Sequence, residues 1–154
     1  DGGPTPHGLE STIVTVHDGK INILRSGPVT AEQLSQYGEV KVVTDNEKVS
    51  APGQLPTHYA PKTPLRLIEN STLFSPPAGQ RVGLLAWRRA DTEGRYTAVR
   101  RLSERHHLRD AAANLFRYLR ELDSLKLDLI VAEHVPEEGL GVAIMDRLRR
   151  AAAK

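Results

Sequence analysis

The segment at residues 50–64, SAPGQLPTHYAPKTP, constrains the fold more than any other stretch, because it contains four prolines and one glycine. Proline fixes φ, removes a backbone donor and pushes the preceding residue toward extended backbone. A flexible tether would instead be rich in serine and glycine, so we expect a semi-rigid connector, here called the strap. The strap contains His58 and Tyr59, whose rings either pack on a neighbouring surface as part of a plain spacer or reach a ligand.

The residues before the strap predict a small β-rich unit. Two β-rich runs, residues 9–16 and 21–25, flank the turn sequence HDGK, which is typical of a β-hairpin. Thr30 and Gln33 have the spacing of a capping box at the start of a short helix, and residues 40–43 favour one more strand. A unit of this size buries little apolar surface, so we expect it to need a further sheet encoded upstream.

The residues after the strap predict an α/β domain. Expected strands cover residues 65–69, 81–87, 96–102 and 127–135, and expected helices cover residues 107–125 and 139–153. The helices have apolar residues spaced by three and four, and arginines near the end of the last helix complement its dipole. Strands connected through helices indicate a mostly parallel sheet of Rossmann-like type.

Composition sets further bounds on the chain. Its 154 residues, 39% of them hydrophobic, suffice for one full domain plus part of another. The only methionine is Met145 and the sequence begins at Asp1, so we expect a piece of a longer protein. The absence of cysteine excludes disulfides and zinc–thiolate sites and agrees with a reducing cytosol. Without an apolar run of 18 residues we expect no membrane segment, and hence a cytoplasmic location.

The charge distribution raises the question of nucleic acid. The formal net charge is +2, and arginines cluster at residues 88–89, 100–101 and 147–150. Acidic residues are interleaved throughout and no aromatic platform accompanies the arginines, which favours an ordinary solvated surface. A contact with double-stranded RNA or tRNA remains the disfavoured alternative.

Two places carry candidate site chemistry. Ser11 follows a glycine-rich turn and Arg25 ends the partner strand, so a hydroxyl and a guanidinium could form an anion or amino-acid pocket, unless both are ordinary surface residues. The sequence EGLG at residues 138–141 resembles a phosphate-binding turn, although tight strand-to-helix packing explains its glycines equally well. The histidines lack a set of ligands at metal-binding spacing, so we assign neither a metal site nor a catalytic residue.

Four motifs together resemble a known family. Their order is that found in the C-terminal half of Sua5-type L-threonylcarbamoyladenylate synthases of the YrdC/Sua5 family. The first motif is DGG followed by GLEST, and the others are ILRSGPVT, APGQLPTHYAP and GLGVAIMDRLRRAA. The resemblance implies three parts. Residues 1–49 would be a partial α+β YrdC-type segment, residues 50–63 a linker with the HYAP motif, and residues 64–154 a Rossmann-like Sua5 domain.

The resemblance also implies a function. The family's enzyme is a nucleotidyltransferase that joins L-threonine, bicarbonate and ATP into threonylcarbamoyl-AMP, releasing pyrophosphate, for the t6A37 modification of tRNA. It implies that Ser11 contacts threonine, that Arg25, His58 and Tyr59 contact ATP, and that Mg²⁺ is carried mainly by ATP. Other proteins of the t6A pathway are possible partners.

Two expectations qualify this function. The family's basic phosphate-binding residues precede the part matched here, so we expect this chain alone to be inactive. The alternative from another class is a non-catalytic α/β module that regulates or binds a partner.

Overall fold

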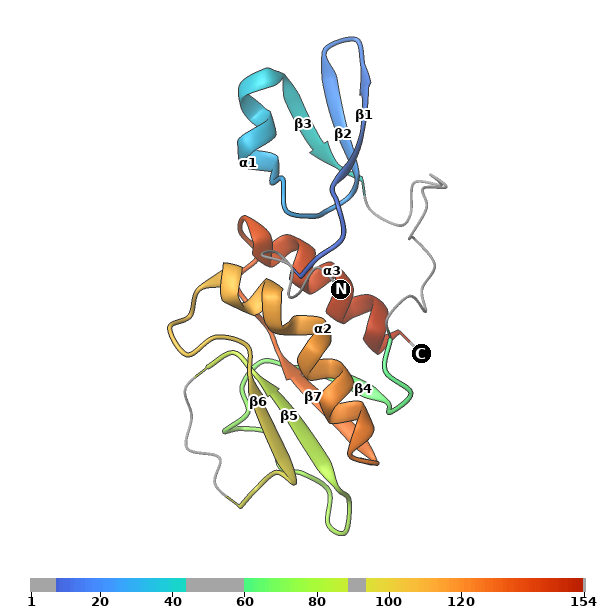
Figure 1. Cartoon of the computed structure of the whole chain (residues 1–154), viewed down its shortest axis with the longest axis vertical. Helices are drawn as coiled ribbons and strands as arrows, with labels where there is room; N and C mark the ends of the chain where they lie inside the picture. The colour runs from blue at the N-terminus through green and yellow to red at the C-terminus, as the bar shows by residue number, and fades with distance from the viewer. Residues whose placement is uncertain (1–7, 44–59, 89–93, 154) are drawn as a thin grey trace, which may run out of the picture.

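The computed structural model describes residues 8–43, 60–88 and 94–153, arranged as two units (Figure 1). The first unit contains β1 (Ile13–His17), β2 (Lys20–Arg25), α1 (Ala31–Leu34), the 3₁₀ turn η1 (Ser35–Tyr37) and β3 (Glu39–Val42). The second unit contains β4 (Leu65–Ile68), β5 (Val82–Ala86), β6 (Ala98–Arg101), α2 (Leu108–Ser124), β7 (Leu129–Glu133) and α3 (Leu140–Ala152). The predicted elements are therefore present, most of them shorter by one to several residues.

The first unit is a three-stranded sheet in the order β1-β2-β3. β1 and β2 form the predicted antiparallel hairpin, and β3 pairs with β2 in parallel. The capping box of α1 is confirmed, because the Thr30 side chain accepts from the Gln33 amide and the Gln33 side chain accepts from the Thr30 amide. Ile21 and Ile23 of the central strand are buried, whereas Val16 of β1 is 67% exposed. The side chains of the central strand β2 are thus partly buried within the unit, whereas most side chains of β1 are exposed to solvent.

The second unit is a four-stranded parallel sheet in the order β4-β7-β5-β6, which confirms the predicted mostly parallel α/β fold. Figure 1 shows α2 and α3 lying over the same face of this sheet. The main core fills the space between them and contains Leu85, Ile130 and Ala132 from the strands. The other face buries Leu84 and Val131.

Within the described residues, connecting segments rather than helices pack on that second face. The crossover from β4 to β5 at residues 69–81 contains no helix, and Phe74 from it packs against the second core. Tyr96 also belongs to this core, and its hydroxyl donates to the Ser71 carbonyl at 2.8 Å. Burial raises the pKa of the Tyr96 phenol, so it stays a neutral hydrogen-bond donor at physiological pH.

Glu133, the last residue of β7, ties the carboxyl ends of three strands together. Its side chain is fully buried, with 0% exposure. Oε1 accepts from the Ser71 amide at 2.8 Å, and Oε2 accepts from the Trp87 and Arg88 amides at 2.8 and 2.7 Å. These amides follow β4 and β5, the two neighbours of β7, so one carboxylate fixes where both segments leave the sheet.

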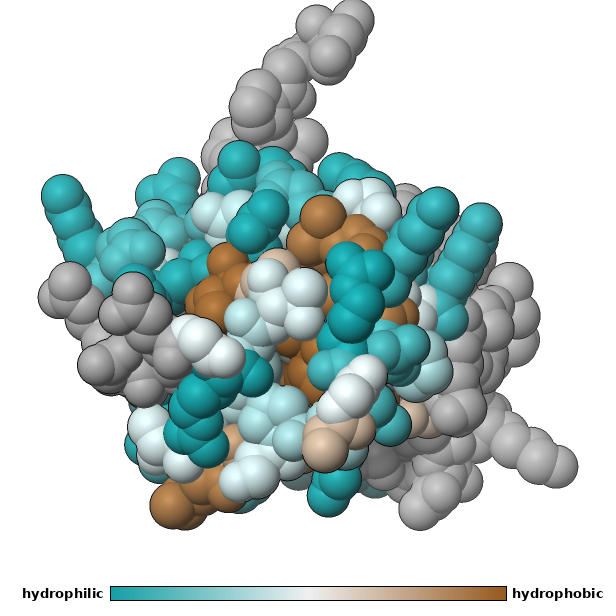
Figure 2. Space-filling model, turned by 90° about the horizontal axis from the view of Figure 1, so that it is seen from below, coloured by the Kyte–Doolittle hydropathy of each residue, from teal (hydrophilic) through white to brown (hydrophobic). Residues whose placement is uncertain are grey.

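The face of the molecule seen from below is mostly polar (Figure 2). Figure 2, which views the molecule from below, shows hydrophilic side chains surrounding small hydrophobic areas. No helix among the described residues is long and apolar enough to cross a bilayer.

Candidate functional site

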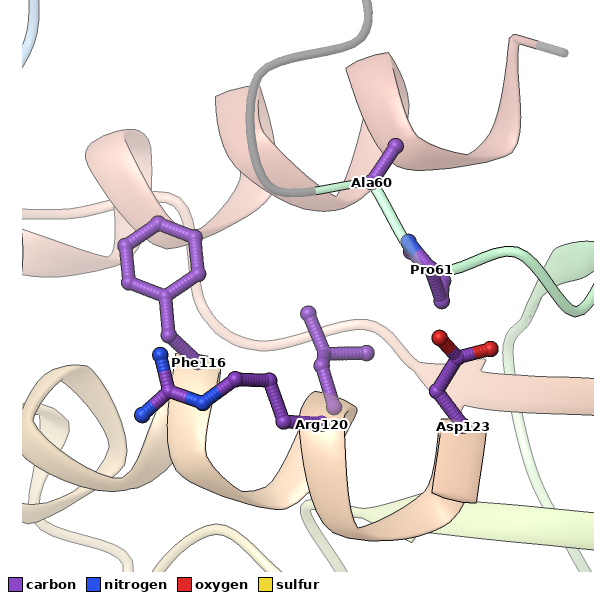
Figure 3. Close-up of a pocket in the computed structure, with 6 residues that line it drawn as sticks. Ala60, Pro61, Phe116, Arg120 and Asp123 are labelled. Carbon is purple, nitrogen blue, oxygen red and sulfur yellow. The ribbon is translucent and has the colours of Figure 1, made fainter. Parts of the chain in front are cut away.

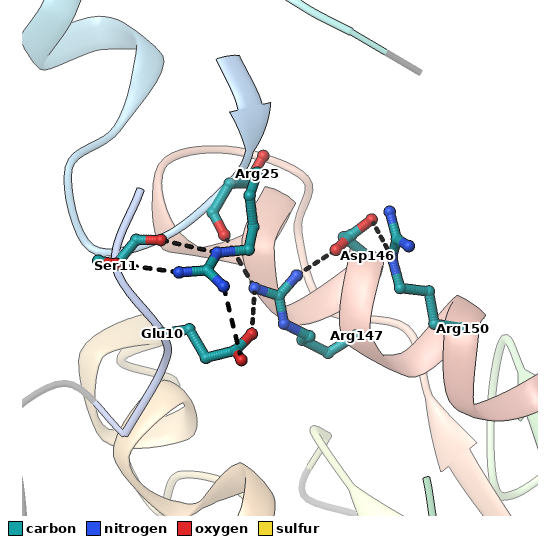
Figure 4. Close-up of polar contacts among 7 residues, drawn as sticks. Glu10, Ser11, Arg25, Asp146, Arg147 and Arg150 are labelled. Carbon is teal, nitrogen blue, oxygen red and sulfur yellow. Dashed lines mark hydrogen bonds and ion pairs between the residues drawn. The ribbon is translucent and has the colours of Figure 1, made fainter. Parts of the chain in front are cut away.

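The structure brings Ser11 and Arg25 into direct contact (Figure 4). Ser11 lies just before β1 and Arg25 ends β2, so hairpin pairing places them side by side. Arg25 Nε donates to the Ser11 carbonyl at 2.9 Å, and Nη2 donates to Ser11 Oγ at 2.9 Å. Two residues predicted to contact different ligands therefore form one polar cluster, here called the Ser11–Arg25 cluster.

The backbone around this cluster is held by a close approach of two segments. A Cβ added to Gly27 would lie 2.4 Å from the Glu10 carbonyl oxygen and 2.5 Å from the Thr12 nitrogen. Thr12 Oγ1 also donates to the Val29 carbonyl at 2.8 Å and accepts from the Val29 amide at 3.0 Å. The loop after β2 thus fixes the position of residues 10–12, and glycine is required where the backbones meet.

Glu10 extends the cluster toward the second unit. Its Oε1 lies 3.6 Å from Arg25 Nη1, and its Oε2 lies 3.0 Å from Nη2 of Arg147 on α3. Arg147 Nη2 also donates to the Ser26 carbonyl at 3.3 Å. The side chains of Glu10 and Arg147 are only 19% and 6% exposed, so this ion pair is shielded from solvent far more than a surface pair.

The segment before Ser11 docks on the second unit by packing as well. A Cβ on Gly8 would lie 2.4 Å from the Ala112 carbonyl oxygen of α2, so the chain passes directly over this helix. Leu9 packs against the main core. Two contacts by packing and one by charge therefore hold residues 8–10 on the α2–α3 face.

The predicted phosphate-like turn before α3 meets a carboxylate of the chain itself. Glu32 Oε1 of α1 accepts from the Gly139 amide at 3.3 Å. The pKa of Glu32 is lowered, first by its hydrogen bond with the Thr30 side chain and also by the Gly139 amide. A Cβ on Gly141 would lie 1.7 Å from the Pro136 carbonyl oxygen, so close packing accounts for this glycine. The structure therefore favours the packing interpretation of this turn.

His58 and Tyr59 lie outside the described residues, so their proposed role stays a prediction. The described end of the strap, Ala60 and Pro61, lies beside α2 and helps to line a cavity of about 160 Å³ (Figure 3). Phe116, Leu119, Arg120 and Asp123 complete the lining. Asp123 also holds the end of the strap, because its Oδ1 accepts a hydrogen bond from the Thr63 amide at 2.8 Å. This hydrogen bond anchors the strap to α2.

Replacing Asp123 by alanine is expected to destabilise the domain by about 1–2 kcal/mol at neutral pH, because the Thr63 amide loses a charged acceptor. Burial raises the Asp123 pKa, but hydrogen bonds from Thr63 and Lys62 outweigh it and hold the pKa below its ordinary value of 3.8. The contribution should therefore persist above that value and disappear as the pH falls below it.

Urea unfolding of the native and Asp123→Ala chains between about pH 7 and pH 3 measures this difference. Glu104→Ala is the control, because the Glu104 side chain is 67% exposed in its pair with Arg101. A difference that grows as the pH falls would contradict the assignment.

Among the described residues, His106, His134 and Arg100 make contacts away from the Ser11–Arg25 cluster. His134 lies 3.6 Å from Glu69, and the His106 ring packs edge-on against Trp87 with centroids 5.4 Å apart. No group of three metal-ligating side chains occurs within residues 8–43, 60–88 and 94–153. Arg100 pairs with Glu121 at 2.6 Å, which neutralises part of one arginine cluster.

Arg147 is the site-linked residue that the sequence did not reveal. Its position near the end of a helix indicates only a favourable interaction with the helix dipole. The available signal was its spacing, because Arg147 falls among Ile144, Met145 and Leu148 on the buried stripe of α3. An arginine in such a stripe requires a partner, here Glu10.

The fold and these contacts define a parallel α/β domain docked through a buried arginine onto a β-unit that carries a serine–arginine cluster. Residues 29–153 match the family described as threonylcarbamoyl-AMP synthase, C-terminal domain. The chain therefore belongs to this family.

Curated relatives of the chain carry the same name. Threonylcarbamoyl-AMP synthase of Bacillus subtilis is 40% identical over 99% of this chain and 47% of that protein. The protein of the same name from Pyrococcus abyssi is 31% identical over 98% of this chain and 48% of its own length. The chain thus spans about half the length of the relatives it matches.

Solved structures show the same fold. P. abyssi Sua5 complexed with L-threonine superposes with a TM-score of 0.76 at 29% identity, covering 99% of this chain and 48% of that one. A P. abyssi Sua5 variant in which a consecutive histidine and tyrosine are replaced by alanine gives a TM-score of 0.75 at 28% identity, covering 99% and 47%.

Proposed function

We propose that the chain is the C-terminal part of an enzyme that makes threonylcarbamoyl-AMP and pyrophosphate from L-threonine, bicarbonate and ATP, for the t6A37 modification of tRNA. The observation that carries this proposal is the Ser11–Arg25 cluster, held by hydrogen bonds of 2.9 Å. It lies in a chain that is 40% identical to the B. subtilis synthase over 99% of its residues.

The three parts expected from the sequence are retained in this proposal. Residues 1–49 would form the end of the catalytic domain, residues 50–63 the linker and residues 64–154 the C-terminal domain. In support, the second unit has two cores of its own, whereas β1 and β3 are the outer strands of a three-stranded sheet. In relatives about twice as long, the preceding half would complete that sheet.

Ser11 is proposed to contact the threonine substrate. Arginine has no acceptor, so Arg25 Nη2 donates to Ser11 Oγ and the serine hydroxyl proton is directed elsewhere. A substrate carboxylate is a suitable acceptor for that proton. The P. abyssi structure complexed with L-threonine supports this choice of ligand.

Arg25, His58 and Tyr59 are proposed to lie near ATP, with Mg²⁺ carried mainly by the nucleotide. The threonine amine and bicarbonate would give a carbamate with loss of one water molecule, and a carbamate oxygen would then attack the α-phosphate of ATP as pyrophosphate leaves. Positioning and neutralisation of charge would dominate such catalysis, which suits a guanidinium at Arg25. The chain has a single consecutive histidine and tyrosine, and the P. abyssi variant replaces a consecutive pair of the same two residue types.

Pyrophosphate release tests the proposal. The full-length parent protein should release pyrophosphate only when ATP, L-threonine and bicarbonate are all present, and residues 1–154 alone should not. In the full-length protein, Arg25→Ala should lower kcat/KM for ATP by about 100-fold, as expected when one donor to a developing charge is lost.

The matched control is Arg66→Ala, because Arg66 lies on β4 and packs over the Phe74 ring. Pyrophosphate release by the isolated chain would refute its expected inactivity, and an unchanged kcat/KM would remove Arg25 from the site. A full-length protein without any synthase activity would favour the non-catalytic module.

A further inference from the structure

We propose that Arg147 of the C-terminal domain is a positioning residue for the Ser11–Arg25 cluster and acts on it through Glu10. The inference rests on the proposed function and extends it, because it gives the C-terminal domain a defined part in binding threonine. It starts from the geometry in Figure 4, where the side chains of α3 and of the hairpin meet.

Arg147 reaches out of its own domain. Its Nη2 contacts Glu10 Oε2 at 3.0 Å and the Ser26 carbonyl at 3.3 Å. Glu10 immediately precedes Ser11, and Ser26 immediately follows Arg25. One guanidinium nitrogen therefore holds the two backbone segments that carry the cluster.

The neighbouring arginine of α3 behaves differently. Arg149 pairs with Glu137, which lies within the same domain. The Arg149 side chain is also 49% exposed, in contrast to the buried side chain of Arg147. The contact with the hairpin unit is thus a property of Arg147 and not of a general basic surface.

The helix holds the Arg147 side chain rigidly. Asp146 pairs with Arg147 Nη1, and its other oxygen accepts from Arg150 Nε at 3.1 Å. Ile144 and Leu148, both at 0% exposure, fix α3 on the main core. A guanidinium attached to such a helix is a fixed reference point for a loop that contacts it.

Glu10 transmits this position to the cluster. Its two oxygens are divided between two guanidiniums, with Oε1 at 3.6 Å from Arg25 and Oε2 at 3.0 Å from Arg147. Without Arg147, Oε2 of Glu10 loses its contact with α3, so Glu10 and the adjacent Ser11 are no longer held in place. The Ser11 hydroxyl would then shift relative to Arg25 and lose its orientation.

The test uses the full-length protein and the Kd of L-threonine, measured by calorimetry without ATP. Arg147→Met and Glu10→Gln should each raise this Kd about tenfold, which is typical when a supporting contact behind a binding residue is lost. The double variant should also show about a tenfold increase, because both changes break the same connection. Arg147→Lys should recover part of the affinity, and Arg149→Met should bind like the unaltered protein.

Other values of the Kd or of the Tm would contradict the inference. An unchanged Kd with a lowered Tm in Arg147→Met would make Arg147 purely structural and overturn the inference. An increase of about 100-fold in the double variant would show independent effects and also overturn it. If Arg147→Met fails to fold, the Kd of L-threonine measured for Arg147→Lys and Glu10→Gln tests the inference in its place. Absence of threonine binding by the unaltered protein would instead refute the proposed function, and the inference with it.

Discussion

Replacing Glu133 by alanine is expected to lower the free energy of unfolding of the C-terminal domain by about 3–5 kcal/mol. Three backbone amides, those of Ser71, Trp87 and Arg88, would lose their acceptor. Two of these hydrogen bonds are buried, and the carboxylate itself is 0% exposed, so water cannot easily replace it. The segments leaving β4 and β5 would lose their common attachment to β7.

Urea unfolding of the 154-residue chain measures this loss. Trp87 is its only tryptophan and lies next to Glu133, so its fluorescence reports on the affected region. Glu133→Gln keeps one acceptor oxygen and should lose about half as much stability. Glu69→Gln is the control, because its side chain is 80% exposed in the pair with His134. A loss below about 1 kcal/mol for Glu133→Ala would show that the amides find other acceptors.

Local signals predicted the secondary structure well. The HDGK turn, the Thr30 capping box and the apolar periods of both long helices each depend on neighbouring residues, and the structure confirms them. Strand order is not such a local property. Nothing within residues 127–135 indicates that β7 inserts between β4 and β5. The glutamate within this apolar stretch was the one sign of a buried polar connection.

The candidate site could be predicted only in part, because some of its contacts depend on neighbouring residues and others depend on distant segments. Ser11 and Arg25 come together through the hairpin, whose pairing can be inferred from its turn. The contact of Glu10 with Arg147 depends on how the two units dock, and this docking rests on Gly8, Leu9 and the Glu32–Gly139 hydrogen bond. Residue types alone do not specify such a contact between distant segments.

Replacing Gly27 by alanine in the full-length protein is expected to lower kcat/KM for L-threonine by about 100-fold, because displacements near 1 Å in a site have effects of this size. The new Cβ would meet backbone atoms of Glu10 and Thr12 at 2.4 and 2.5 Å, and backbone cannot turn aside as a flexible side chain can. Residues 10–12 must shift, and the Ser11 hydroxyl shifts with them. Steady-state pyrophosphate release at varied threonine concentration measures the effect.

Gly19→Ala separates this displacement from general destabilisation. Gly19 lies in the turn of the same hairpin at φ +73°, and a Cβ there meets nothing within 4 Å. Alanine at Gly19 should therefore cost about 1 kcal/mol in backbone strain while leaving kcat/KM close to that of the unaltered protein. If the two variants lose stability and activity in parallel, the close approach at Gly27 serves only folding. A large loss of activity at Gly27, with a Tm no lower than that of Gly19→Ala, would show that the position of residues 10–12 sets the activity.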